Sequence, residues 1–501
     1  NPFGFFVQDD WKLKPNLSLT LALRWDDFTN HTSWGDSGFQ FSSFILGSGS
    51  TLAQQVGAGS VKVVPGVFAN SQTNLWSPRI GFAWDPTRSG NWNIRGGVGV
   101  YRDWITLGQT VDEMRNNPPG VLSETFTQTA PNGQPLGNYF AFAQSGTYPF
   151  NFPLPPIPPG SLNAQGGITG IPTNVWSLDR NMKPPYAVNY MIGVEHQLPW
   201  HLVAGANYSG SRGYDQLVGT DVNRCAGCAT VAGGVVTINR LNSSFGVINY
   251  VRGQNASTYN AMILTLRGRP SARLNFQGSY TLSHAMDYPE AGTRFDQDIG
   301  FNIPDQNAYF SYWGNADWDV RQRLSFSGTY IIPGLHSGFA KVLTSGWELS
   351  SIAAAQSGTP FWVVNNLPLT AGGDYNQDGN NWDIPMTPST NYTGSYSRQQ
   401  YINGLFTAAN FPAPLAGTEG NLPRNIYRNP GLVQIDASVL KNSHIPWLGE
   451  GGNLQFRFDF LNVLNHVNLG GVHNFMADPL FGKVTSALSA RQIQLGMRVS
   501  F

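Results

Sequence analysis

Hydrophobic and polar residues alternate along many stretches of the chain, as they do in a β-strand with one apolar and one polar face. In the last stretch, residues 491–501, one parity is entirely apolar: Ile493, Leu495, Met497, Val499 and Phe501. The same alternation, weaker in some places, predicts about thirteen strands in an all-β protein. They lie near residues 3–11, 17–29, 76–85, 92–104, 186–197, 202–213, 257–267, 273–285, 318–332, 347–362, 431–441, 453–467 and 491–501.

The predicted connections alternate between short and long. The long ones are residues 30–75, 105–185, 214–256, 286–317, 363–430 and 468–490. Outer-membrane barrels have this rhythm because tight turns face the periplasm and long loops face the exterior. Tryptophans near the predicted strand ends suit the lipid–water boundary; they are Trp11, Trp84, Trp104, Trp200 and Trp347. We therefore expect a transmembrane antiparallel β-barrel in a bacterial outer membrane, rather than a soluble sandwich or propeller.

In such a barrel the apolar face of each strand meets lipid, and the polar face meets a wet lumen. Only a closed barrel satisfies every backbone polar group within the hydrocarbon. The charged residues expected on the lumen side are Arg24, Asp26, Arg95, Glu195, Arg267, Arg457, Asp459 and Arg498. We interpret them first as a hydrated wall of mutually paired charges.

Composition narrows the class further. Charged residues make up 12% of the chain, against roughly 25% in an ordinary soluble domain. We find no apolar run of the ~18 residues that a membrane-spanning helix needs. Lys plus Arg and Asp plus Glu both number 30, so no polyanionic partner such as nucleic acid is indicated. Asn1 begins a strand-like segment without an initiator Met, so we expect a piece of a longer protein.

Several segments resemble the TonB-dependent receptors. The segments 6–11 and 17–24 look like a paired-strand signature of that family. Features of its Oar-like branch are similar to residues 346–352, 356–360, 436–441 and 460–466. The terminal Phe501 resembles the signal by which the barrel-assembly machinery recognises outer-membrane proteins.

The resemblance implies a barrel of about 22 strands, an N-terminal plug and a segment that contacts TonB. Residues 1–501 would then be the C-terminal portion of the barrel, with the plug and N-terminal domains absent from this chain. The implied partners are outer-membrane lipid, the barrel-assembly machinery, the TonB system acting through the plug, and an unknown extracellular ligand. Some lumen-facing charges would grip the plug in the intact receptor.

One loop has the spacing of a calcium site. Asp374, Asn376 and Asp378 occupy positions one, three and five of a calcium-type loop, with Gly379 at the turn and Asn380 at position seven. Alternate oxygens at this spacing converge on one hard cation. Position twelve is Pro385 instead of the usual Glu, so Asp383 would have to substitute for it. The alternative is a turn without an ion, because Asp, Asn and Gly favour turns in any case.

The only two cysteines, Cys225 and Cys228, lie in a predicted external loop. In an oxidising compartment they are expected to form a small disulfide. A redox-active pair would require a thioredoxin-like helix, and a tetrahedral zinc site would require two more ligands.

No pattern of catalytic residues emerges, so we predict no enzyme. Our first hypothesis is TonB-dependent uptake, in which external loops capture a substrate that then passes a plugged barrel. The alternatives are a surface adhesion or assembly protein and a passive, porin-like channel. A plug and a TonB segment would favour the first hypothesis, and conductance without a plug would favour the channel.

Overall fold

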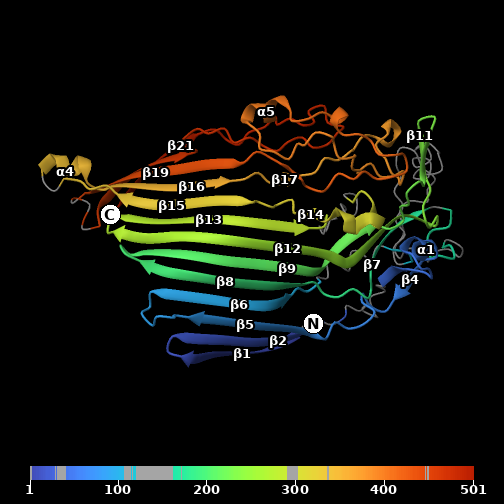
Figure 1. Cartoon of the computed structure of the whole chain (residues 1–501), viewed down its shortest axis with the longest axis horizontal. Helices are drawn as coiled ribbons and strands as arrows, with labels where there is room; N and C mark the ends of the chain where they lie inside the picture. Colours follow the sequence, from blue (N-terminus) through green and yellow to red (C-terminus); the bar gives the residue numbers. More distant parts are fainter. Residues whose placement is uncertain are drawn as a thin grey trace, which may run out of the picture.

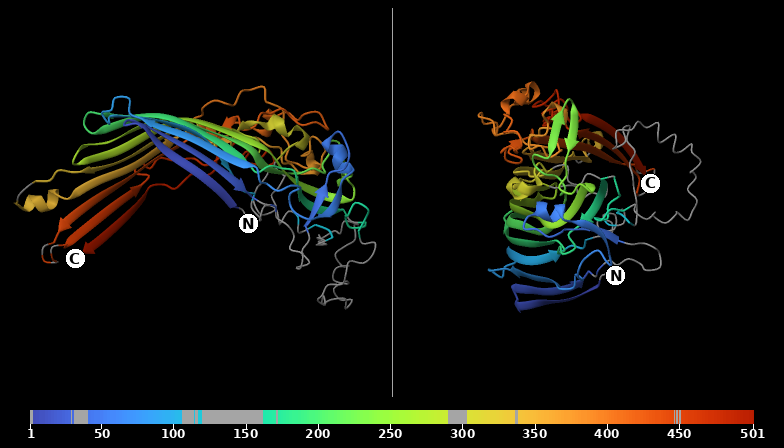
Figure 2. Two further views of the ribbon diagram at one scale, coloured as in Figure 1. Left: turned by 90° about the horizontal axis from the view of Figure 1, so that it is seen from below. Right: turned by 90° about the vertical axis from the view of Figure 1, so that its right-hand side faces the viewer.

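The computed structural model describes residues 3–28, 30, 41–105, 114, 117–119, 162–170, 172–289, 303–335, 338–445, 447, 449 and 451–501. Its main element is one large, curved and mostly antiparallel sheet, with its longer loops gathered at one end (Figures 1 and 2). The predicted loops 30–75, 105–185 and 286–317 fall partly outside the described residues.

Thirteen strands follow one another across this sheet, as the alternation predicts. In order across the sheet they are β1 (Phe3–Lys14), β2 (Leu17–Asp27), β5 (Leu75–Trp84), β6 (Trp92–Arg102), β8 (Tyr186–Leu198), β9 (Leu202–Asp221), β12 (Phe245–Ser271), β13 (Leu274–Asp287), β15 (Gln322–Ile331), β16 (Trp347–Gln356), β19 (Leu432–His444), β20 (Asn453–Leu461) and β21 (Gln492–Ser500). The sheet is open, with β1 and β21 at its two edges. All-β architecture and antiparallel pairing along this path are therefore confirmed.

The strand register keeps the two faces separate. On β15, Phe326 lies opposite Gly278 of β13 and Ala353 of β16, whereas the next residue, Ser327, lies opposite Gln277 and Ile352. Because side chains alternate between faces, one face collects Leu, Phe, Val and Trp and the other collects Ser, Thr, Gln and charged groups. A broad apolar face of this kind is stable against hydrocarbon and unfavourable in water.

The short connections lie together at one end of the sheet and the long ones at the other (Figure 1). Two of the short connections are the tight turns between β1 and β2 and between β8 and β9. The connection between β15 and β16 contains the helix α4 (Gly338–Thr344). The short–long rhythm expected from the sequence is present.

Strands β9 and β12 are much longer than the sequence predicts. The sequence predicts strands over 202–213 and 257–267 joined by a loop, but β9 continues to Asp221 and β12 already begins at Phe245. Their pairing is interrupted by register shifts between Gly253 and Ser257. A further strand, β7 (Thr173–Leu178), pairs with the outer part of β12 in parallel. These extensions are polar and rich in glycine, so they lack the alternation of apolar and polar residues that predicts a strand.

The described parts of the long connections form a cap that contains regular elements. Its additional elements are β3 (Phe41–Ile45), β4 (Ser60–Val64), β10 (Ala229–Ala232), β11 (Val235–Ile238), β14 (Gly314–Asn315), β17 (Pro360–Phe361), β18 (Tyr427–Arg428), α1 (Leu52–Gly57) and α5 (Arg398–Asn403), with short 3-10 turns η1 (Gln306–Tyr312), η2 (Leu369–Ala371) and η3 (Ala408–Asn410). None of the helices in the described part of the chain has the length and apolarity needed to cross a bilayer.

Candidate functional site

The concave side of the sheet carries a wall of charged residues. Arg24 Nη2 lies 2.7 Å from Asp26 Oδ1, and Arg457 Nε lies 2.8 Å from Asp459 Oδ1. Each of these pairs joins residues two apart on one strand, because such residues point to the same face. Arg498 lies in register with Gln455 on this side.

Glu195, on β8, forms ion pairs with two arginines of this wall. Its two carboxylate oxygens lie 3.4 Å from the guanidinium groups of Arg95, on the adjacent strand β6, and Arg267, on β12, two strands away on the other side. The structure thus brings together three charges that the sequence separates widely. The arrangement fits the predicted wall of mutually paired groups.

Glu195→Gln should lower the free energy of unfolding only slightly, by about 0–1 kcal/mol. Both arginines are about half exposed, so water replaces much of the lost interaction. Urea unfolding of the full-length protein in lipid vesicles measures the change, with Gln197→Ala on the same strand as a control. A loss above about 2 kcal/mol would mean that these pairs hold the fold.

A depression of about 840 Å³ opens on the concave face, and residues of this wall form part of its lining. Its polar lining includes Arg267, Asp436, Arg457, Asp459 and Gln494. The depression is wide and open rather than enclosed, so it resembles a docking surface more than a small-molecule cavity.

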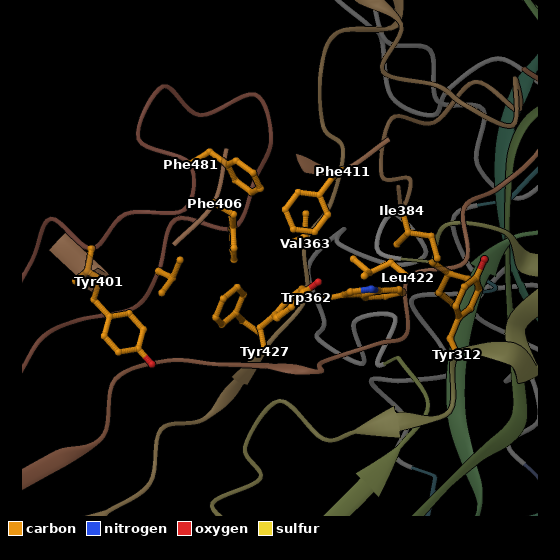
Figure 3. Packing of buried hydrophobic residues seen from close by; sticks show 14 of the residues in the cluster. Tyr312, Trp362, Val363, Ile384, Tyr401, Phe406, Phe411, Leu422, Tyr427 and Phe481 are labelled. Carbon is orange, nitrogen blue, oxygen red and sulfur yellow. The ribbon is translucent and has the colours of Figure 1, made fainter. Parts of the chain in front are cut away.

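The cap at the long-loop end is built on a buried aromatic core (Figure 3). Phe406 lies at its centre, with ring centroids 5.1 Å from both Phe411 and Phe481 and 5.6 Å from Tyr427. Phe406, Phe411 and Tyr427 come from the connection 363–430 and Phe481 comes from the connection 468–490. The same core includes Tyr312 from the connection 286–317, so it fixes several long connections to one another.

The predicted calcium loop is part of this cap, and its turn has a defined shape. The backbone N–H groups of Asp378 and Gly379 donate to the two carboxylate oxygens of Asp374, at 2.9 and 2.8 Å. The N–H of Asp378 also lies 3.1 Å from Asn376 Oδ1. Gly379 has a φ of +88°, a backbone conformation that glycine adopts without strain.

The predicted ligands Asn380 and Asp383 end the same loop. Asn380 Oδ1 accepts a hydrogen bond from the N–H of Trp382. Asp383 is fully buried, at 0% exposure, and its Oδ2 accepts from the N–H of Tyr375. Its other oxygen, Oδ1, has no hydrogen-bond partner among the described residues.

The two cysteines lie against this loop. Cys225 and Cys228 are joined by a disulfide. The N–H of Gly227 donates to the Asn376 carbonyl at 2.8 Å, and that of Ala229 donates to the Gln377 carbonyl at 2.6 Å. The disulfide loop is therefore docked on the Asp/Asn loop by main-chain hydrogen bonds.

Two further segments meet at the same place. Arg224, beside the disulfide, contacts Asp378 with Nη1 at 3.2 Å from Oδ2 and donates from Nη2 to the Ile303 carbonyl at 2.9 Å. The N–H of Gly417 donates to the Tyr375 carbonyl at 2.8 Å. We call this meeting point the loop hub and define it as residues 221–229, 303–306, 374–385 and 417–422.

Glu419 is the residue of the loop hub that the sequence pattern missed. Its Oε1 accepts from the N–H of Ile384 at 2.5 Å, and its Oε2 has no hydrogen-bond partner among the described residues. It belongs to a different loop from Asp383, and only the fold places the two together. The segment 417–420 reads Gly-Thr-Glu-Gly, which carries no metal-site spacing.

The carboxyl groups of the loop hub have perturbed acidities. Burial raises the pKa of Asp378 to about 6, although the nearby Arg224 guanidinium opposes the shift. Burial, together with the charge of Asp378, raises the pKa of Asp383 well above its usual range. Burial and the charge of Asp383 raise the pKa of Glu419 in the same way. The loop hub thus gathers carboxyl groups in a place shielded from water, where the raised pKa values favour the neutral, protonated form as long as no cation is bound.

Oxygen ligands dominate the loop hub, so a hard cation is the chemistry that it suits. In the described part of the chain, no three His, Cys, Asp or Glu side chains already stand together as a metal-binding group. The oxygens of Asp374 and Asp378 are instead held by main-chain N–H groups and, for Asp378, also by Arg224.

Comparison with known proteins gives one family match. Residues 1–494 match a family described as "Outer membrane beta barrel domain". No curated protein matches the chain.

Three solved structures resemble the fold at low identity. The siderophore receptor PiuA from Acinetobacter baumannii has 10% identity and a TM-score of 0.43, with 99% of this chain and 42% of that chain covered. The outer membrane transporter YddB from Escherichia coli has 10% identity and a TM-score of 0.46, with 99% and 53% covered. The ferripyoverdine receptor of Pseudomonas aeruginosa has 9% identity and a TM-score of 0.44, with 100% and 38% covered. The chain therefore spans about half the length, or less, of these structures.

Proposed function

The chain belongs to the family of outer membrane beta barrel domains, and from this premise we propose that it forms part of a TonB-dependent receptor of the Oar-like kind. Such a protein lies in the bacterial outer membrane with its long loops outside. In the proposed function, the cap captures an extracellular ligand, and energy passed through TonB moves a plug so that the ligand crosses the barrel. No catalytic step is assigned.

The observation that carries this proposal is that the curved sheet is open. Thirteen strands form an open trough whose two edges remain far from meeting (Figure 2). Bacterial outer-membrane barrels close with an even number of strands, so closure requires further strands. Barrels of about 16–18 strands leave a water-filled channel, whereas those of about 22 strands hold a plug. The charged residues around the open depression on the concave face favour the class that holds a plug.

The polar wall supports the presence of a plug. Arg267, Arg457 and Asp459 all line the open depression on the concave face. Charged groups in such a position can make charge-assisted hydrogen bonds to a protein domain inside the barrel. A simple hydrated wall accounts for the pairing among these groups, and plug contact accounts for their concentration around one broad surface.

The aromatic core of the cap supports ligand capture. Loops that are already packed lose little conformational entropy when they bind, which favours affinity. A surface adhesion or assembly protein would benefit from the same order and is therefore the second candidate. A passive porin-like channel is the third, and it needs no plug.

We expect the full-length protein, purified from native outer membranes, to be much larger than this chain and to bind the isolated periplasmic domain of TonB. Its mass and N-terminal sequence test the first point, and surface plasmon resonance tests the second. In planar bilayers with KCl, the plug should keep conductance low.

Two results would contradict the proposal. A large, steady conductance without TonB binding would support the passive channel. A native polypeptide that starts at Asn1 and does not bind TonB would support a surface-binding protein.

A further inference from the structure

We propose that Glu419 completes a calcium site with Asp374, Asn376, Asp378 and Asp383, and that the bound ion fastens the loop hub. Asn380, at position seven, would contribute its main-chain carbonyl, as that position does in calcium loops. This inference goes beyond the proposed transport function and does not depend on it.

The first support is the shape of the loop. The Asp374 carboxylate is oriented by two main-chain N–H groups, and Gly379, with a positive φ, makes the turn at the position where calcium loops have glycine. Asn376 and Asp378 are both almost fully buried, which is unusual for polar residues in a loop. A turn that served only to reverse the chain would leave these side chains in water.

The second support is a pair of buried oxygens without partners. Asp383 Oδ1 and Glu419 Oε2 have no hydrogen bond in the described part of the chain, although Asp383 is fully buried. The remaining oxygen of each group already accepts a main-chain N–H, from Tyr375 and Ile384 respectively. A buried carboxylate oxygen without a partner is strongly unfavourable. A cation between the two groups supplies the missing partner.

The third support is the charge balance. Asp374, Asp378, Asp383 and Glu419 bring four carboxylates to the loop hub, and the one ion pair given for them in the described residues is that of Arg224 with Asp378. Carboxylates held near one another repel each other when they are ionised. Binding of a divalent cation would remove this repulsion.

The ligand chemistry selects calcium. The site offers only oxygen donors, which disfavours zinc and copper because these metals prefer nitrogen or sulfur ligands. Magnesium requires nearly ideal octahedral geometry and retains several waters, whereas calcium accepts six to eight oxygens at flexible positions. A loop of five neighbouring residues plus one distant carboxylate fits the more flexible ion.

Position twelve of the loop is Pro385, where a calcium loop usually has Glu. Pro385 cannot ligate, but the N–H of Gly420 donates to the Ile384 carbonyl at 3.1 Å and that of Leu422 donates to the Pro385 carbonyl at 3.2 Å. These bonds run the segment 417–422 alongside the end of the loop. Glu419 is thereby delivered to the position that the loop itself leaves empty of a carboxylate.

Calcium binding to the full-length protein in detergent tests the inference. After chelator treatment, isothermal titration with CaCl₂ should show one site per chain. Its dissociation constant should be about 1 mM or lower, since extracellular calcium modules have dissociation constants of about 0.1–1 mM. Terbium should bind competitively, and its luminescence should be excited through Trp382 and Tyr375, which lie inside the loop. Thermal unfolding of the cap should shift upward with about 10 mM CaCl₂ and less with MgCl₂.

Two variants identify the ligands. Glu419→Gln and Asp383→Asn should each weaken calcium binding at least about tenfold, because each loses a charged oxygen donor. Asp179→Asn, in a different loop of the cap, should leave it unchanged. If the wild-type protein shows no calcium-dependent heat or thermal shift, or if Glu419→Gln binds as tightly as wild type, the proposed site is wrong. Because the wild-type titration needs no variant, a misfolded variant does not obscure the answer.

Discussion

Phe326→Arg is expected to lower the free energy of unfolding in lipid by about 2–4 kcal/mol, the value for arginine on the lipid face near the bilayer centre. Phe326 lies in the middle of β15 on the apolar face, where its side chain is 42% exposed to the surroundings of the protein. Its ring stacks on Phe276 of the neighbouring strand at 6.3 Å. The guanidinium would lose its hydration there, and the ring contact would also be lost.

The adjacent residue provides the matched control. Ser327 lines the depression on the concave face, so Ser327→Arg places the same charge in water and should change stability by less than about 1 kcal/mol. Urea titration of the full-length protein in vesicles of one lipid composition gives both values. Equal losses for the two variants, or a larger loss for Ser327→Arg, would mean that the two faces are assigned incorrectly.

Phe406→Ala is expected to destabilise the cap by about 3–5 kcal/mol, as large-to-small changes of buried aromatic residues do. Phe406 is 4% exposed, and its ring contacts those of Phe361, Tyr392, Phe411, Tyr427 and Phe481. Truncation leaves a cavity that these rings can fill only by leaving their own positions. Among the described residues, the strands of the main sheet contribute to this core only through Val218, near the outer end of β9, so they should retain their stability.

Hydrogen exchange followed by mass spectrometry separates these two regions. In Phe406→Ala, protection should fall in residues 357–431 and 472–484 and remain unchanged in β12 and β13. Leu415→Ala, at a position 81% exposed in the same connection, should alter protection little. Loss of protection throughout the sheet would mean that the cap and the strands fold as one cooperative unit.

The strands of the sheet were predictable because their two faces meet different environments. On β20 and β21, Phe456, Phe458 and Phe460 lie in register with Met497, Leu495 and Ile493. Each pair shares the apolar face, so a two-residue period is imposed at every step. The charged pairs Arg24–Asp26 and Arg457–Asp459 were predictable for the same reason.

The cap could not be predicted in this way because no two-residue period is imposed on it. Its order depends on contacts between distant loops, such as Arg424 with Asp287 and Arg428 with Asp319. The local part of the proposed calcium site, Asp374 to Asp383, is readable from spacing alone. Glu419 is not, because its position depends on how two separate loops lie against one another.

The extra length of β12 has a mechanical consequence. At roughly 3.3 Å per residue, its 27 residues form a rod that joins Phe245 in the cap directly to Arg267, the partner of Glu195 in the charged wall. Between these two residues, the pairing of β12 with β9 shifts register from Gly253 to Ser257, and such bulges bend strands. Any movement of the cap relative to the barrel would therefore bend β12 at this place, and the continuous strand would carry the rest of the movement to the charged wall.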